Sequence, residues 1–360
     1  MIAFFCGTPF QLMNAINLKI SLHKNEIAEI YVFNYFRNAE EIARNLEKTN
    51  IFEKVYIIET NKYKSPYGII KKFIMDNSIK KEFGNKNYKQ LYICYNGLLQ
   101  NLFYNLFLNT NKNMIVNFFD EGTATYIYPY KNALKSVYKI FLALLRMKSM
   151  DKHLDSVYLY CPSAIQENKQ YKVKQLPKIS KKNEELINIY NQTFDYKCEE
   201  NEFEDRNIIF FEESFSQDTD CSDEELIVMV LNSIDKDEII VKRHPRVKKN
   251  RYIDYGVRYN KNSSIPWELY LLNNDFQEKI LITLSSTAAI SPKVIFDEEP
   301  RVVILYHLLD KKAYIHTDFF DKYIDSIKNL YNDKEKFLLA KSKEEFYRYI
   351  NYTDKMHKDN

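Results

Sequence analysis

Short runs of β-branched and aromatic residues alternate with helical patterns along almost the whole chain, and this alternation restricts the available folds most. In the first half, the runs that predict strands are residues 2–6, 30–33, 55–58, 91–94, 114–119 and 157–160. Helical patterns follow at residues 9–22, 39–48, 67–81 and 98–108. Strands that alternate with helices predict βαβ units and a parallel sheet. The sequence therefore favours the α/β class.

The alternation restarts in the second half of the chain. Strands are predicted at residues 208–211, from Glu238, at 279–284 and at 301–304, and helices after Ser222, after Pro266, at 319–331 and at 334–352. Ser222 and Glu225 predict a capping box at the first of these helices. A chain of 360 residues is long for one hydrophobic core and suggests two domains. The acidic stretch 196–206 lacks apolar periodicity and is predicted to link a domain of residues 1–195 to one of residues 207–360.

Composition excludes several classes of protein. The formal net charge of +3 lacks the basic excess of a nucleic-acid-binding protein. Five cysteines without a C-x-x-C pair indicate neither a disulfide framework nor a zinc site, so we expect a reducing cytoplasm. The first residues lack the basic region and apolar length of a signal peptide, and no later run reaches about 18 apolar residues. Any membrane contact is therefore expected to be peripheral.

The most informative stretch is 238–246, a β-branched run followed by Lys242, Arg243, His244, Pro245 and Arg246. Ligands of open α/β sheets bind outside the carboxyl ends of the strands, and Pro245 would end this strand there. Cations around an imidazole favour an anionic ligand, most simply a phosphate. A strand end with solvated charges and a capping histidine explains the stretch about equally well.

Two further segments follow predicted strands. Thr8, with Pro9 and Gln11, predicts a capped helix start directly after the first strand and Gly7. Asp120, Glu121 and Gly122 come directly after the strand at 114–119, where a site would form and where glycine allows close backbone approach. The alternatives are a purely structural helix start and an ordinary acidic turn.

Ser285, Ser286 and Thr287 end the strand at 279–284 and are predicted to begin a helix. Hydroxyl groups and free backbone N–H groups at a helix start predict a phosphate cradle.

A helical pattern at residues 132–150 carries apolar residues together with Lys135, Lys139, Arg146 and Lys148. Such a basic amphipathic helix can lie on an anionic membrane surface. A core helix with a solvated face is the commoner explanation.

Together these segments resemble the bacterial sialyltransferases, and in their order most closely glycosyltransferase family 52, which contains lipooligosaccharide and capsule sialyltransferases. The segments are residues 7–11, 120–123, 244–246, 266–268 and 285–287. The resemblance implies a GT-B fold, with two Rossmann-like domains whose parallel sheets face an interdomain cleft. It also implies an acceptor-binding first domain, a second domain that binds CMP-sialic acid, inversion at the anomeric carbon and no metal or other cofactor.

The resemblance also implies roles for individual residues. His244 matches a histidine that contacts the donor phosphate and acts as general acid. Glu268 and residues 285–287 match positions that hold the cytidine, its ribose and the phosphate. The predicted donor-binding set is Gly7, Gln11, Glu121, Gly122, Arg243, Pro245, Arg246, Glu268, Ser285, Ser286 and Thr287.

The general base is less clearly marked. A carboxylate shortly before the His-Pro pair serves in the family, and Asp218 matches it best, with Glu213 and Asp220 close enough to compete. Asp120 matches the base of other sialyltransferase families. Asp218 and Asp220 also spell the D-x-D of metal-dependent glycosyltransferases, but that motif belongs to a different fold.

The chemistry agrees with this division of roles. Sialyl transfer needs a carboxylate to deprotonate an acceptor hydroxyl and cations to stabilise the departing CMP phosphate. Protein cations that neutralise the phosphate would make a metal unnecessary.

We expect a sialyltransferase that transfers sialic acid to a terminal galactose through an α2,3 linkage. Its expected location is the cytoplasm or, as a peripheral protein, the cytoplasmic face of the inner membrane. A homodimer and the choice between lipooligosaccharide and capsule stay open. Two rivals remain: a relative that uses another donor, such as a hexose nucleotide or CMP-Kdo, and a non-catalytic sugar-nucleotide-binding partner of a capsule-assembly complex.

Overall fold

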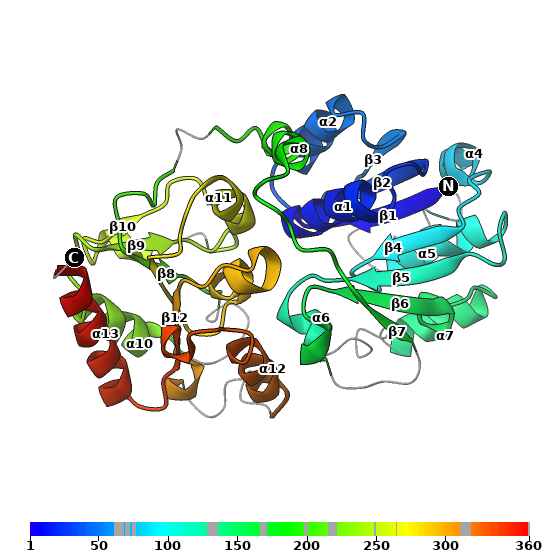
Figure 1. The fold of residues 1–360 in the computed structure, drawn as a ribbon. Coiled ribbons are helices and arrows are strands. Elements are labelled where there is room, and N and C mark those ends of the chain that lie inside the picture. The colour runs from blue at the N-terminus through cyan, green and yellow to red at the C-terminus, as the bar shows by residue number, and fades with distance from the viewer. Residues whose placement is uncertain are drawn as a thin grey trace. The chain divides into compact units, whose positions relative to one another are not determined.

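The computed structural model describes residues 1–60, 68, 73, 77–127, 136–165, 171–197, 201–214, 222–247, 250–263, 265–309 and 318–358. The chain divides into two compact units, Met1–Tyr196 and Lys197–Asn360. Each unit contains one parallel sheet with helices (Figure 1). These are the two α/β domains expected of the GT-B class.

The first unit is built on a seven-stranded sheet in the order β3-β2-β1-β4-β5-β6-β7. Its strands are β1 Ile2–Cys6, β2 Ala28–Phe33, β3 Lys54–Ile58, β4 Gln90–Ile93, β5 Ile115–Phe119, β6 Leu154–Leu159 and β7 Lys172–Gln175. Its helices are α1 Pro9–Leu22, α2 Ala39–Lys48, α4 Asn77–Phe83, α5 Leu98–Leu108, α6 Thr123–Ile127, α7 Ser136–Leu144 and α8 Glu184–Phe194. Strand order reverses at β1, which lies between β2 and β4.

The second unit repeats this arrangement with six strands in the order β10-β9-β8-β11-β12-β13. Its strands are β8 Ile208–Phe211, β9 Ile239–Lys242, β10 Arg258–Tyr259, β11 Ile280–Thr283, β12 Arg301–Ile304 and β13 Phe337–Leu339. Its helices are α10 Glu224–Asn232, α11 Trp267–Asn273, α12 Asp318–Lys328 and α13 Lys343–Lys358, with a 3₁₀ turn Thr287–Ala289 and a π-helix Pro292–Phe296. Here the order reverses at β8, between β9 and β11.

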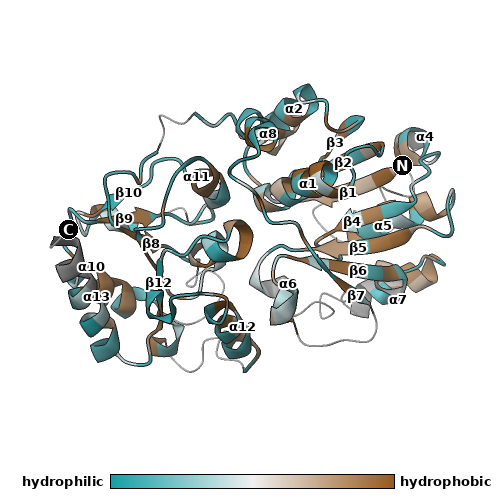
Figure 2. Cartoon of the chain, in the orientation of Figure 1, coloured by the Kyte–Doolittle hydropathy of each residue, from teal (hydrophilic) through white to brown (hydrophobic). Residues whose placement is uncertain are grey.

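Both sheets follow the Rossmann strand order, in which right-handed crossovers run first one way and then the other from the first strand. In the first unit α1 and α2 both contact α8, and α4 contacts α5. All five residues of β1 are buried, as are all six of β2, so apolar and polar positions do not alternate along these strands, and Glu29 is the one charged residue in them. Figure 2 shows the same distribution, with brown strands in both sheets and teal outer faces on α12 and α13.

Several expected elements differ from those observed. Residues 334–352 are not one helix, because Phe337–Leu339 form β13 beside β12 and only then does α13 begin. The edge strands β7 and β10 were not predicted, since lysine-rich or two-residue strands lack a run of apolar residues. Most of the helix predicted at 67–81 lies outside the described residues. Within that range the structure describes residues 68 and 73 and the first part of α4, from Asn77.

The acidic stretch predicted to be a linker packs into the second unit. Phe203 is fully buried against the rings of Trp267 and Tyr270, at centroid distances of 5.6 and 4.9 Å. Lys279 donates hydrogen bonds to the backbone carbonyls of Phe203, Glu204 and Arg206. The sequence did not predict this packing, because it depends on one aromatic residue and three backbone carbonyl groups and produces no apolar periodicity.

Candidate functional site

A pocket lies at the point of strand-order reversal in the first unit. Its volume is about 420 Å³, and its lining comes from residues at the carboxyl ends of β1, β2, β4 and β5 and at the starts of α1 and α5. The lining residues are Phe5, Cys6, Gly7, Thr8, Gln11, Phe33, Tyr35, Tyr95, Gln100 and Glu121. Crevices at such reversal points are the usual ligand sites of open α/β sheets. The rings of Tyr35 and Tyr95, each about half exposed, give the pocket aromatic walls.

Gln11 connects the helix start to the acidic triplet. The predicted cap is confirmed, since the Gln11 N–H donates to Thr8 Oγ1 at 3.2 Å and Pro9 occupies the first turn. The Gln11 side chain accepts from the Gly7 N–H at 2.6 Å and donates to Glu121 Oε2 at 2.6 Å. Gln11 therefore orients the Glu121 carboxylate.

Two glycines stand where larger residues would not fit. A Cβ on Gly7 would lie 2.8 Å from Cδ2 of Tyr35, so a side chain there would displace this wall of the pocket. Gly122 has a φ of 106°, which L-residues rarely adopt, and its N–H donates to Asp120 Oδ1 at 2.9 Å.

Asp120 points into the protein. Its carboxylate accepts from the Tyr126 hydroxyl, from the Gly122 N–H and from the Tyr160 N–H, the last at 3.1 Å, and the residue is 2% exposed. Burial raises its pKa to about 6, although these hydrogen bonds counteract the shift. Asp120 thus fixes the turn after β5 and does not line the pocket.

Glu121 is the carboxylate that lines the pocket. Burial raises its pKa to about 7, with a further increase from the charge of Asp120 and a decrease from the Gln11 hydrogen bond. A carboxylate with a pKa near the working pH is suited to accept a proton. The pocket therefore combines aromatic walls with one oriented candidate base.

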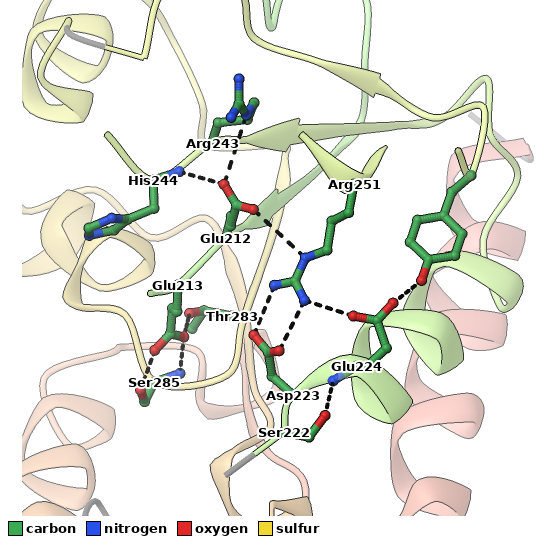
Figure 3. A network of polar contacts seen from close by, with 11 residues as sticks. Glu212, Glu213, Ser222, Asp223, Glu224, Arg243, His244, Arg251, Thr283 and Ser285 are labelled. Carbon is green, nitrogen blue, oxygen red and sulfur yellow. Dashed lines mark hydrogen bonds and ion pairs between the residues drawn. The ribbon is translucent and has the colours of Figure 1, made fainter. Parts of the chain in front are cut away.

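In the second unit, the carboxyl ends of β9, β8 and β11 lie side by side and carry Lys242–Arg246, Glu212–Ser214 and Ser285–Thr287. Glu212 connects the first two groups (Figure 3). Its carboxylate accepts from the His244 N–H at 3.0 Å and lies 3.9–4.0 Å from Nε of Arg251 and Arg243. Burial raises the pKa of Glu212, and the His244 N–H and both arginines lower it.

Arg251 extends this network to the start of α10. Its guanidinium binds both carboxylate oxygens of Asp223 at 3.0 Å and one of Glu224 at 2.8 Å. Because Asp223 is engaged in this way, the capping box predicted from Ser222 and Glu225 does not form. Instead Ser222 Oγ accepts from the Glu224 N–H, and Asp223 occupies the cap position without capping.

The His244 ring points away from Glu212 (Figure 3). Its Nδ1 accepts from the Arg246 N–H at 3.2 Å, so in the neutral ring the proton lies on Nε2. The main chain of His244 is held by Glu212 and its ring by the residue after Pro245. This arrangement presents an Nε2–H donor beyond the sheet edge.

The two neighbouring arginines differ. Arg243 lies largely buried, and its guanidinium donates to the Val247 carbonyl at 3.0 Å, so it stabilises the loop. Arg246 is exposed and donates to Ser214 Oγ at 2.9 Å. Pro245 is exposed between them.

The serine segment after β11 does not begin a helix with free N–H groups. A three-residue 3₁₀ turn follows, and Glu213 occupies the donors: its carboxylate accepts from Ser285 N and Oγ at 2.5 Å and from Ser286 N at 3.0 Å. Thr283 Oγ1 also donates to Glu213, at 2.9 Å. Burial raises the pKa of Glu213, and these donors oppose the shift. The geometry of an anion cradle is present, with an internal carboxylate in it.

Lys242 and Glu268 lie near the end of β9 and the start of α11, and each affects the pKa of the other. The Lys242 side chain is 6% exposed and donates to the Ile265 carbonyl at 3.4 Å. Burial lowers its pKa to about 8, against the opposite effect of Glu268. Burial also raises the pKa of Glu268, against Lys242.

Asp218 and Asp220 lie outside the described residues. Among the described residues, no three His, Cys, Asp or Glu side chains group closely enough to hold a metal ion. Nor does any described helix combine the length and hydropathy needed to cross a bilayer.

The sequence did not single out Tyr35, Tyr95, Glu212 or Arg251. Glu212 follows a buried strand directly, which was the one available signal. The partners of Arg251 are 27 residues away or more, so spacing alone could not pair them.

A family model described as alpha-2,8-polysialyltransferase (POLYST) matches residues 2–305. The chain belongs to this family. The prediction of a sialyltransferase is thereby confirmed at the level of the family. Every described site residue above lies inside the matched range, and α12 and α13 lie outside it.

Comparisons of this alpha-2,8-polysialyltransferase family member with solved structures find distant similarity. No curated protein matches it. A UDP-N-acetylglucosamine 2-epimerase structure is 10% identical over 93% of this chain and 92% of its own, with a TM-score of 0.47. The spinosyn rhamnosyltransferase SpnG is 9% identical over 98% and 91%, with a TM-score of 0.46. The N-terminal domain of Candida albicans trehalose-6-phosphate phosphatase is 10% identical over 98% and 92%, with a TM-score of 0.41.

Proposed function

We propose that this protein transfers sialic acid from CMP-sialic acid to a sugar hydroxyl, with inversion and without a metal. Its membership of a sialyltransferase family supports transfer of sialic acid. The observation that carries the chemistry is the Nε2–H of His244, held at the strand-order reversal of the second unit with Arg246 nearby in the chain. A hydrogen-bond donor and a cation at that place suit a departing phosphate.

The second unit, in this proposal, binds the donor. His244 Nε2–H and Arg246 stabilise the CMP phosphate as the bond from the anomeric carbon to the phosphate oxygen breaks and the electron pair leaves with CMP. Lys242 and Glu268 contribute to the nucleotide site. Ser285 and Ser286 contact the phosphate only when Glu213 releases their donors, because its carboxylate accepts them in the structure. Thr287, the next residue, completes this proposed phosphate contact.

The first unit binds the acceptor in its aromatic-walled pocket, so this proposal assigns Gly7, Gln11 and Glu121, which were predicted to bind the donor, to the acceptor site. The acceptor hydroxyl attacks the anomeric carbon, and Glu121 takes its proton. Glu121 is favoured over Asp120 because Glu121 lines the pocket, whereas the Asp120 oxygens are engaged by Tyr126, Tyr160 and Gly122. Asp218 stays a second candidate base.

The acceptor is proposed to be a glycan that ends in sialic acid, extended through an α2,8 linkage, as the description of the family model names that linkage. The order of motifs that resembles family 52 supports a second candidate, a galactose-terminated acceptor with α2,3 linkage. In either case the glycan belongs to a cell-surface capsule or lipooligosaccharide, and the reaction takes place in the cytoplasm.

The test measures CMP release from CMP-sialic acid in EDTA, with lactose or an α2,8-linked sialic acid trimer as acceptor. We expect acceptor-dependent release with the trimer, and at least a 100-fold loss of kcat in the variants His244→Ala and Glu121→Gln, since general acid–base groups contribute about 10²–10⁴-fold. Release only with lactose would select the second candidate. A requirement for Mg²⁺ or Mn²⁺ would contradict the metal-independent mechanism.

Two other outcomes identify the rival functions. Turnover of CMP-Kdo or a hexose nucleotide, with none of CMP-sialic acid, would replace the donor. Binding of CMP without turnover of any donor, and unchanged glycan production in cells that carry His244→Ala, would show a non-catalytic partner.

A further inference from the structure

A second pocket of the first unit has no place in the proposed reaction. It has a volume of about 490 Å³ and lies where the end of α5 meets α4 and the segment after α7. Four of its lining residues are cations, Lys80, Lys112, Arg146 and Lys148, and none of the described residues that line it is acidic.

The position of two of these cations is fixed by the backbone. Asn105 of α5 donates from Nδ2 to the Lys148 carbonyl at 2.7 Å, and its Oδ1 accepts from the Lys148 N–H at 2.7 Å. Arg146 adopts a φ of 55°, and its N–H donates to the Ala143 carbonyl at the end of α7. The rim of the pocket is therefore a defined turn attached to a buried helix.

The positive charge is not neutralised by the described part of the chain. No carboxylate among the described residues forms an ion pair with any of the four cations. Like charges around one hollow repel one another, and a bound anion relieves this repulsion. Arg and Lys together favour the oxygens of a phosphate.

Exposed apolar side chains on α7, the helix that leads into the pocket-lining segment 145–148, distinguish between anions. Ile140 and Leu144, one turn apart on α7, are 62% and 74% exposed, and Figure 2 colours much of this helix brown. Leu106 and Met147 add apolar surface to the pocket wall. Neither inorganic phosphate nor a hydrated anionic glycan has a hydrocarbon layer that such exposed side chains could enter, whereas a lipid layer offers phosphates above hydrocarbon.

The aromatic-walled pocket and the basic pocket lie toward opposite ends of α5. Gln100, near the start of the helix, lines the aromatic-walled pocket, and Leu106 and Leu108, at its end, line the basic one. The two pockets share no lining residue, so a ligand in the basic pocket does not occupy the aromatic-walled pocket.

We propose that the basic pocket holds the phosphate of an anionic phospholipid while Ile140 and Leu144 enter the lipid layer, so that this end of α5 docks the protein on a membrane. This inference is independent of the proposed function, because it concerns another pocket and does not depend on the donor or the acceptor.

The test is co-sedimentation of the full chain with vesicles of phosphatidylcholine alone or mixed with phosphatidylglycerol. We expect binding to the mixed vesicles only, weakened by salt. The variant Arg146→Gln/Lys148→Gln should bind about 25-fold more weakly, since each cation near an anionic surface contributes about fivefold. The variant Ile140→Ser/Leu144→Ser should also bind more weakly, without loss of fold, because both side chains are exposed.

The matched control is Lys89→Gln/Lys182→Gln, which removes two exposed lysines of the same unit elsewhere. Equal weakening by the control would show attraction by overall charge and overturn the proposal. It would also be overturned if Arg146→Gln/Lys148→Gln kept full vesicle binding, or if that variant lost binding of inorganic phosphate or of a soluble sialic acid polymer while vesicle binding stayed unchanged.

Discussion

At the scale of single residues, the pH dependence of transfer distinguishes the two adjacent carboxylates. A general base acts when deprotonated, so kcat/KM rises with pH through the pKa of the base in the free enzyme. Burial places this pKa at about 7 for Glu121 and about 6 for Asp120. With Glu121 as the base, we expect kcat/KM to fall below a pH near 7, which is the acid limb of the profile. The variant Glu121→Gln should lose most of the activity, and the activity that remains should no longer show this fall.

The variant Asp120→Asn provides the comparison. An amide nitrogen at this position would face the donors Tyr126, Tyr160 or Gly122, so unfolding should become easier by about 1–3 kcal/mol. The limb of the remaining activity should persist and move to a lower pH, because the charge of Asp120 contributes to the raised pKa of Glu121. A limb near 6 that vanishes in Asp120→Asn would assign the base to Asp120.

The sequence located this acidic triplet at a strand end but could not separate the roles of its members. Which carboxylate points inward depends on Tyr126 and Tyr160, and the second comes from the end of another strand. Gln11, which orients Glu121, is 110 residues away in the chain. Such partners follow from sheet order and not from local spacing.

At the scale of elements, Arg251 ties the start of α10 to the strand ends that hold His244. In Arg251→Met, Asp223 and Glu212 lose their nearest cation while both carboxylates stay buried. Removing one partner of a buried ion pair typically costs about 3–5 kcal/mol. We expect this loss in urea unfolding of the second unit, followed through Trp267, the single tryptophan of the chain.

Arg258→Met is the matched control. Arg258 and Asp205 form an ion pair whose side chains are 40% and 56% exposed, so its loss should cost less than about 1 kcal/mol. Equal unfolding midpoints for the two variants would show that the Glu212–Arg251–Asp223 network does not stabilise the unit.

The same network shows where element prediction from sequence stops. Short apolar runs marked β1, β8, β9 and β11 because each is buried on both faces. The capping box at Ser222 was wrong because Asp223 binds Arg251, and the helix start at Ser285 was wrong because Glu213 accepts its donors. Each error concerns a polar group whose partner lies on another element.

At the scale of the whole molecule, the two sheets share one strand order, and alternating strands and helices predicted both of them. The residue at which the second unit begins could not be predicted from the sequence. Phe203 lies before β8, yet it is fully buried beside Trp267, Tyr270 and Phe276. Because local composition around it is acidic, its sequence resembles a linker while its side chain belongs to the core.

This packing predicts where the second unit can be cut. A fragment of residues 197–360 should fold, because it retains Phe203 and the carbonyls that Lys279 binds. A fragment of residues 207–360 loses both and should be less stable by at least about 3 kcal/mol, the loss typical of removing a buried phenylalanine side chain. Unfolding exposes Trp267 to water and shifts its emission to the red. In urea, this shift should occur at a lower concentration for the 207–360 fragment than for the 197–360 fragment. In the full chain, Phe203→Ala should reproduce most of this loss. Equal midpoints for the two fragments would mean that residues 201–206 contribute no stability and act only as a linker.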